Sequence, residues 1–397
     1  MLAAGCAEGY SVNLTLFPIQ RPRLGLTIDA RTLSMLEVQR DWGRGRRNRD
    51  VKLCSERALP AGLVTLSATE PNISDVAALA GEVRALRGDH RKASHVMSVA
   101  LSLPDLSARV ALFEFEVWPS KPAECDALLR WRFQKDFGIA STGARLAFRA
   151  FPPTADSVAG GGDKTHRVLA AAIQARIIEQ YEQACELARF IPISLGVTSL
   201  RLFDLCRPVM AAARGEVKPD SSASGQVTET ESSEMFFLHV SQAAFSFFAV
   251  RHHRPVFYRI KPLRNGHTNL ADEVRATVQF YDESRPAAPN GYPVLPRPLI
   301  IVSGEELCPE GRRLGEIGAP DQDQTSAEPG TAVAAPPVSM GVSWRNLIDP
   351  DFAASLHLHM IPVGWENLLR SRNGQAPREI QARPLSALAA LAGVWEG

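Results

Sequence analysis

The sequence contains no apolar run of the roughly 18 residues that a membrane-spanning helix needs. It also lacks a surplus of either charge: 44 Lys and Arg oppose 43 Asp and Glu, which leaves a formal net charge of +1. Without a basic surplus, no overall field attracts nucleic acid, and any partner must be recognised by a local surface. These absences argue against a helical membrane protein and against a nucleic-acid partner.

Cysteine is scarce, and the sequence has no CxxC pair. The six cysteines are dispersed, which is typical of reduced, structural thiols, and we therefore expect a cytoplasmic protein. The stretch LAAGC, which ends at Cys6, resembles a lipoprotein cleavage box. A secretory signal needs a basic start and an apolar stretch of about 7–15 residues. Only five residues precede Cys6 and none is basic, so we expect no secretory signal.

What the chain does have is enough apolar sequence for a sizeable core, with 45% hydrophobic residues in 397. Two stretches are poor in large apolar residues, and we expect a flexible linker at 211–233 and a disordered insertion at about 315–340. The linker separates two comparable halves. The predicted organisation is an N-terminal extension (1–20), a first domain (21–210), a second domain (234–370) and a C-terminal tail (371–397). The tail either docks on a partner helix or packs on its own domain.

Hydrophobic patterning predicts similar elements in both halves. In the first half we expect antiparallel strands within 24–38 and 51–59, a helix near 73–87, and a strand pair at 96–103 and 109–118. A helix at 122–137, a strand at 146–151 and two strand-to-helix segments at 166–190 and 191–206 follow. The second half has strands within 235–260, a helix at 269–284 and a strand at 298–306. Strand meanders followed by strand–helix alternation, twice over, indicate a duplicated mixed α/β design.

The order of these segments resembles the PilM family of type IV pilus assembly proteins, which are actin-like and related to FtsA and to the cytoplasmic domain of GspL. The opening stretch LGLTIDARTLSMLEV (24–38), the helix ECDALLRWRFQKDF (124–137) and the stretch RVLAAAIQARIIEQYEQACELA carry the resemblance. It covers roughly residues 21–370. It implies an actin-like ATPase fold of two RNase-H-like domains, with an inserted 1C-type subdomain at about 95–155. A last helix, near 351–370, would return to the first domain.

The resemblance also identifies where the family binds nucleotide, and here the usual residues are replaced. A gapless overlay places the metal-associated aspartate, the turn glycine and the lysine of the first hairpin on Thr27, Asp29 and Ser34. The other family positions, which are acidic residues, a second turn glycine and the adenosine turn, fall on Gly196, Thr198, His239, Ser241, Gly304 and Glu305. Shifting the first hairpin by two residues would instead put Asp29 at the acidic position, where it would bind a metal. The second hairpin allows no such shift, because no aspartate lies between 235 and 260.

Glycine turns present backbone N–H groups to phosphate, so a carboxylate at Asp29 or Glu305 opposes nucleotide binding. Losing three such hydrogen bonds weakens binding by roughly 5–9 kcal/mol if the losses add. That is about a thousandfold or more in dissociation constant. We therefore expect a pseudo-ATPase with no cofactor and no metal site. ATP with magnesium, held by atypical residues, is the alternative.

For function, the resemblance implies a non-catalytic cytoplasmic adaptor of type IV pilus assembly. Such a protein is peripheral at the inner face of the inner membrane and contacts other pilus or secretion proteins. It binds the cytoplasmic N-terminal peptide of a PilN-like membrane protein near subdomain 1C. Candidates for lining that site are Phe113, Phe115, Leu129 and Phe133, whose other interpretation is domain core. The alternatives are an active actin-like ATPase, a kinase of the same superfamily or a GspL-like component of type II secretion.

Overall fold

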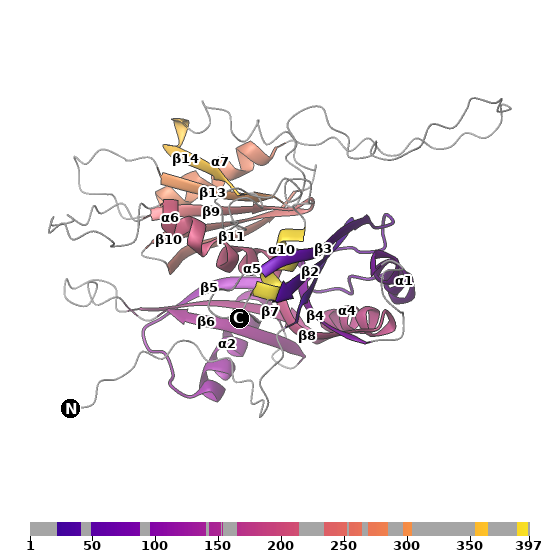
Figure 1. Ribbon diagram of the computed structural model, residues 1–397. Helices are drawn as coiled ribbons and strands as arrows, with labels where there is room; N and C mark the ends of the chain where they lie inside the picture. Colours follow the sequence, from indigo (N-terminus) through magenta and orange to yellow (C-terminus); the bar gives the residue numbers. More distant parts are fainter. Residues whose placement is uncertain are drawn as a thin grey trace, which may run out of the picture.

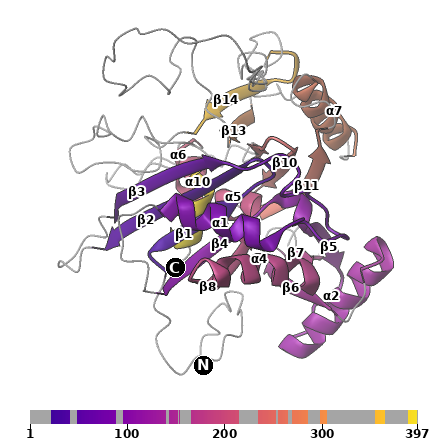
Figure 2. The same cartoon turned by 90° about the vertical axis from the view of Figure 1, so that its right-hand side faces the viewer.

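The computed structural model describes residues 22–40, 49–87, 96–139, 143–151, 153, 165–213, 234–251, 254–263, 269–284, 297–303, 354–363 and 387–395. These residues form two five-stranded sheets and one three-stranded sheet (Figures 1 and 2). In Figure 1 the sheet that contains β9 to β14 lies above the first large sheet, and the three-stranded sheet lies to the left of the first at about the same height.

The first large sheet has the order β3-β2-β1-β4-β8. An antiparallel meander of β1 (Leu24–Ile28), β2 (Thr32–Arg40) and β3 (Arg49–Ala58) is extended by the parallel strands β4 (Met97–Leu103) and β8 (Phe190–Val197). Every residue of β1 is buried, as expected for a central strand covered on both faces. Helices α1 (Val76–Arg87) and α4 (Ala175–Leu187) pack together on one face, seen in front in Figure 2.

The second large sheet repeats this arrangement in the order β11-β10-β9-β13-β14. Its meander comprises β9 (Glu234–Val240), β10 (Ala244–Arg251) and β11 (Arg254–Pro262), and its parallel strands are β13 (Arg297–Ser303) and β14 (Leu358–Pro362). Helix α7 (Leu270–Glu283) buries its apolar face, made of Leu270, Val274, Val278 and Tyr281, against this sheet. The duplicated mixed α/β design predicted from the sequence is therefore confirmed.

The small sheet has the order β5-β7-β6 and is covered by α2 (Pro122–Phe137). Its strands are β5 (Arg109–Phe115), β6 (Ala144–Phe151) and β7 (His166–Gln174). This differs from the predicted subdomain boundaries of 95–155, because β4 belongs to the first sheet and β7 to the small one. The predicted pairing of 96–103 with 109–118 is also wrong. A short 3-10 helix, η1 (Asp105–Ser107), directs β4 and β5 into different sheets, and alternation alone does not choose a strand's partner.

The C-terminal part also differs from the prediction. The family resemblance predicts a returning helix near 351–370. This prediction is wrong over 358–362, where the chain forms strand β14 beside β13. Helix α10 (Ala387–Trp395), which lies inside the predicted tail, packs on the first sheet instead. It contacts β1, β2, β4 and α5 (Thr198–Leu205). Its approach is so close that a Cβ added at Gly25 would collide with the carbonyl of Ala390. The described part of the tail, 387–395, therefore packs within this chain, on the sheet of the first half.

Helix α6 (Arg207–Ala213) includes the first three residues predicted as linker, 211–213. The rest of that linker, the extension 1–20, the insertion 315–340 and the positions Gly304 and Glu305 lie outside the described residues. In the described part of the chain, no helix combines the length and apolar character needed to cross a membrane.

Candidate functional site

The two β-hairpins expected to hold phosphate have the same geometry in both halves. Thr27 lies opposite Ser34 across the first hairpin, and His239 lies opposite Ser246 across the second. Each turn is closed by a 2.8 Å backbone hydrogen bond, from Asp29 N–H to the Thr32 carbonyl in the first and from Ser241 N–H to the Ala244 carbonyl in the second. The overlay made on the sequence therefore pairs equivalent positions of the duplicated fold.

Between the halves lies Asp105, a buried carboxylate at the start of η1 that follows β4. Its Oδ1 accepts a hydrogen bond from the backbone N–H of Ser199 on α5, at 2.8 Å. Its Oδ2 accepts one from Ser246 Oγ at 2.7 Å and one from His239 Nδ1 at 3.0 Å. Since Ser199 belongs to the first half while His239 and Ser246 belong to the second, this carboxylate joins the two halves.

The electrostatics of this cluster favour an ionised carboxylate. Burial alone raises the pKa of Asp105, but the hydrogen bonds from His239, Ser199 and Ser246 outweigh it and hold the pKa below the ordinary value. An ionised carboxylate only accepts hydrogen bonds, so the His239 ring donates from Nδ1. The neighbouring Tyr258 is partly buried with its hydroxyl oxygen inaccessible to solvent, and burial raises its pKa. A charged carboxylate with three donors is electrostatically satisfied in place.

The cluster contains the residue types of a hydrolytic triad, but their connections are different. In a triad, the serine hydroxyl bonds to histidine and the histidine to aspartate. Here Ser246 and His239 both bond to the same oxygen of Asp105. All three side chains are at most 5% exposed, so no substrate reaches the hydroxyl. The arrangement has the features of a structural contact.

The segment that carries Asp105 is fixed from the other side as well. Ser107, two residues further along η1, accepts a hydrogen bond of 2.6 Å from the amide of Asn72. The same amide lies 3.4 Å from the hydroxyl of Tyr181 on α4, whose pKa is raised to about 12 by burial. Helix η1 also contacts β10 and β11 of the second half. It is thus held between the two halves by contacts on both sides.

Two further predicted positions, Gly196 and Thr198, lie where β8 meets α5. Gly196 leaves space for the buried side chain of Arg201, with which an added Cβ would collide. The Arg201 guanidinium donates to Ser102 Oγ at 3.0 Å and to Ser194 Oγ at 2.7 Å. The Thr198 hydroxyl donates to the carbonyl of Leu103 at 2.8 Å. These positions form internal contacts in the first half.

The structure thus brings His239 into the central cluster and leaves Asp29 at the tip of the first hairpin, where its carboxylate accepts from the N–H of Ala30 at 2.7 Å. The central residue, Asp105, was missed from the sequence, where Pro104-Asp105 reads as an ordinary turn. The usable signal was a carboxylate that follows a mostly apolar strand after a single proline. Among the described residues, no group of three His, Cys, Asp or Glu side chains is placed to hold a metal ion.

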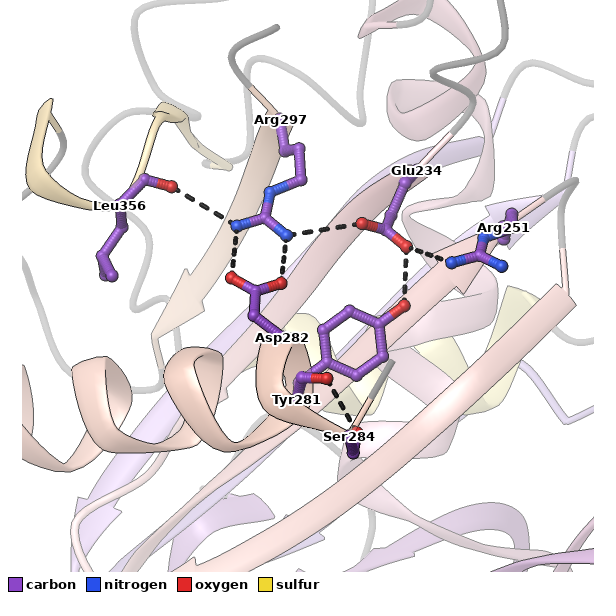
Figure 3. A network of polar contacts seen from close by, with 7 residues as sticks. All are labelled: Glu234, Arg251, Tyr281, Asp282, Ser284, Arg297 and Leu356. Carbon is purple, nitrogen blue, oxygen red and sulfur yellow. Dashed lines mark hydrogen bonds and ion pairs between the residues drawn. The ribbon is translucent and has the colours of Figure 1, made fainter. Parts of the chain in front are cut away.

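A second polar cluster lies wholly in the second half and anchors α7 to its sheet (Figure 3). The Arg297 guanidinium makes two hydrogen bonds to Asp282, of 2.6 and 2.9 Å. The buried carboxylate of Glu234 accepts from Tyr281 Oη at 2.6 Å and from Arg251 at 2.9 Å. This cluster resembles the first in chemistry but joins elements of one half only.

Three of the four residues proposed to line a peptide site are interior. Phe113, Leu129 and Phe133 are at most 4% exposed and form the core between α2 and the small sheet, with Phe113 and Phe133 edge to face at 5.2 Å. Phe115 packs against this core. Alternation does not distinguish a groove-lining aromatic from a core aromatic, and here the core interpretation is correct for the three buried side chains.

No protein-family model and no curated protein match the sequence. Among solved structures, the chain is similar to the PilM-PilN type IV pilus biogenesis complex, with a TM-score of 0.62, 16% identity, and coverage of 94% of this chain and 98% of that one. A weaker similarity is to the cytoplasmic domain of EpsL, an inner membrane component of the type II secretion system of Vibrio cholerae (TM-score 0.37, 9% identity, 70% of this chain and 81% of that one). Another is to a protein with actin-like ATPase fold from Bacteroides thetaiotaomicron (TM-score 0.36, 8% identity, 71% and 82%). The chain resembles PilM along nearly its whole length, and its fold is that of the actin-like ATPases.

Proposed function

We propose that this protein is a non-catalytic, PilM-like adaptor of type IV pilus assembly that binds the cytoplasmic N-terminal peptide of a PilN-like inner-membrane protein. The support is the similarity, over 94% of this chain, to the PilM-PilN type IV pilus biogenesis complex. In this role the protein is cytoplasmic, lies at the inner face of the inner membrane and contacts other proteins of the pilus or secretion machinery.

The observation that carries the non-catalytic part is the bonding of Asp105 to the second hairpin and to α5. Hydrolysis of a nucleotide requires acidic groups that hold magnesium and orient water. Asp105, the buried carboxylate beside the second hairpin, has both oxygens engaged by Ser199, Ser246 and His239. The position expected to carry an aspartate in that hairpin is His239 itself, and its counterpart in the first hairpin is Thr27.

A surface suited to an extended peptide is the outer edge of β8, the last strand of the first sheet. Ile191 and Ile193, two residues apart on this strand, lie on one face of the sheet with exposed fractions of 51% and 40%. Alternate exposed apolar side chains on an edge strand favour binding of an extended peptide, which adds main-chain hydrogen bonds and fills side-chain pockets. This surface replaces the buried aromatic residues as the proposed peptide site.

Calorimetry with the full-length chain tests the proposal. The ligand is a synthetic peptide with the sequence of the cytoplasmic N-terminus of a PilN-like membrane protein from the same genome. We expect saturable binding by the wild type and at least about tenfold weaker binding by Ile191→Asp/Ile193→Asp, because charge at both positions disfavours an apolar strand partner. Phe280→Asp is the matched control, since Phe280 is similarly exposed on α7 of the second half, and it should bind as the wild type does.

Absence of binding by the wild type would contradict the adaptor function, and equal binding by the Ile191→Asp/Ile193→Asp variant would contradict the proposed surface. A parallel titration with ATP and magnesium separates the adaptor from an active ATPase. We expect no heat at micromolar concentrations, and micromolar affinity would contradict the pseudo-ATPase proposal. Selective binding to the corresponding peptide of a type II secretion protein would assign the chain to that system instead.

A further inference from the structure

We infer that the two halves of this protein are held closed by an internal contact, in which Asp105 bridges them in the way a ligand between two lobes would. The protein then acts as one rigid body, and no nucleotide is needed to close it. The inference concerns the coupling of the halves and stands whichever partner the protein binds.

The hydrogen bonds of Asp105 cross the boundary between the halves. Asp105 and Ser199 belong to the first half, whereas His239 and Ser246 lie on β9 and β10 of the second. Separating the halves would break two of its three hydrogen bonds, those from His239 and Ser246, and water would have to replace them. Hydrogen bonds to a charged group are stronger than neutral ones, so the contact resists opening.

Apolar packing crosses the same boundary between the halves. Phe203 on α5 stacks on Phe248 of β10, with ring centroids 4.8 Å apart and planes within 13°. It also meets Phe237 of β9 edge to face at 5.5 Å. All three rings are buried and belong to a single hydrophobic core that includes β1, β4 and α4 of the first half. Opening would therefore expose aromatic surface together with the carboxylate.

Helix η1 is anchored to both halves. Ser107 is hydrogen-bonded to Asn72 of the first half, and Asp105 is hydrogen-bonded to His239 of the second. The short segment between them is therefore fixed to both halves. A hinge motion would have to break one set of these bonds.

Hydrogen exchange measured by mass spectrometry on the full chain tests this inference. Asp105→Asn is nearly isosteric but turns one acceptor oxygen into a donor group facing His239 and Ser246. The matched control is Glu234→Gln, which makes the same change to a buried carboxylate whose partners among the described residues include Arg251, Arg297 and Tyr281 of the second half. Both changes weaken a buried network, but only the first crosses between halves.

We expect Asp105→Asn to accelerate exchange at least tenfold in peptides covering both 198–203 and 235–248. Glu234→Gln should accelerate exchange only in peptides of the second half. Unchanged exchange at 198–203 in Asp105→Asn, or equal patterns in the two variants, would overturn the inference. If Asp105→Asn does not fold, Ser246→Ala, which removes one donor, decides it by showing or lacking a smaller increase in the same two segments.

Adding ATP and magnesium to the wild type provides an independent readout. Exchange at 198–203 and 235–248 should be the same with and without nucleotide, because closure is already complete. Protection of these segments by nucleotide would mean that closure depends on a ligand and would overturn the inference. Peptide binding by the wild type, measured separately, reports on the adaptor function and is unaffected by either result.

Discussion

At the residue scale, the cluster around Asp105 illustrates how side chains between two lobes can bond to each other instead of to a ligand. His239 occupies the hairpin position at which the resemblance predicts an acidic residue, and it donates to a carboxylate from the other half. Ser246, directly opposite on the hairpin, donates to the same oxygen. A hydrogen-bond donor at this position thus goes together with an acceptor supplied from η1.

The lowered pKa of Asp105 predicts how stability depends on pH. A carboxyl group whose pKa is lower in the folded state contributes stability above its unfolded pKa of about 3.9. That contribution is lost as the pH falls through the folded value. We therefore expect the wild type to exceed Asp105→Asn in free energy of unfolding by a constant amount above about pH 5, and the difference to shrink below about pH 4. Urea unfolding at a series of pH values measures it, and a difference that grows on acidification would contradict it.

At the element scale, the close contact of α10 with β1 depends on one missing side chain. Gly25→Ala would place a methyl group against the backbone of Ala390, which has no flexible end that can move aside. We expect a loss of about 1–3 kcal/mol in the free energy of unfolding, as overpacking usually costs, with α10 displaced from the sheet. Chemical denaturation measures the loss.

The control for this change is Gly81→Ala on α1, where nothing lies within 4 Å of the added methyl group. Alanine is favoured over glycine inside a helix by roughly 1 kcal/mol, so this variant should be as stable as the wild type or more so. If Gly25→Ala matched Gly81→Ala in stability, the contact between α10 and β1 would not be the constraint that the geometry indicates.

The elements also show which features the sequence predicts and which it does not. Local alternation identified both hairpins, and helix 122–137 agrees with α2 at both ends, because such patterns follow from the faces that each element buries. The partner of each strand is a long-range property, and the pairing predicted for 96–103 and 109–118 was wrong for that reason. The returning helix was predicted at 351–370, but the helix that packs on the first half from the C-terminal part is α10. Its short Ala- and Leu-rich sequence fits a partner surface equally well, so the sequence does not assign it to the core. Asp105 was missed because its role depends on groups from α5, β9 and β10.

At the scale of the whole molecule, one hydrophobic core contains residues of both halves. Met235, Phe237 and Ile300 of the second half belong to the same buried cluster as Leu26 and Leu101 of the first. A second cluster lies between α7 and the far face of the second sheet, and a third lies under α2. The shared core makes the boundary between the halves part of the folded interior.

This shared core predicts that the two halves unfold together. In urea, circular dichroism and hydrogen exchange of peptides covering 24–38 and 235–248 should follow one transition with a single midpoint, as coincident probes do when unfolding is cooperative. Asp105→Asn should lower that midpoint because it removes charged hydrogen bonds across the boundary, each contributing about 1.5–3 kcal/mol. Separate midpoints for the two peptides in the wild type would mean that the halves are independent folding units. In that case the contacts of Phe203 and Asp105 would join two halves that fold separately, and one half would keep its structure while the other unfolds.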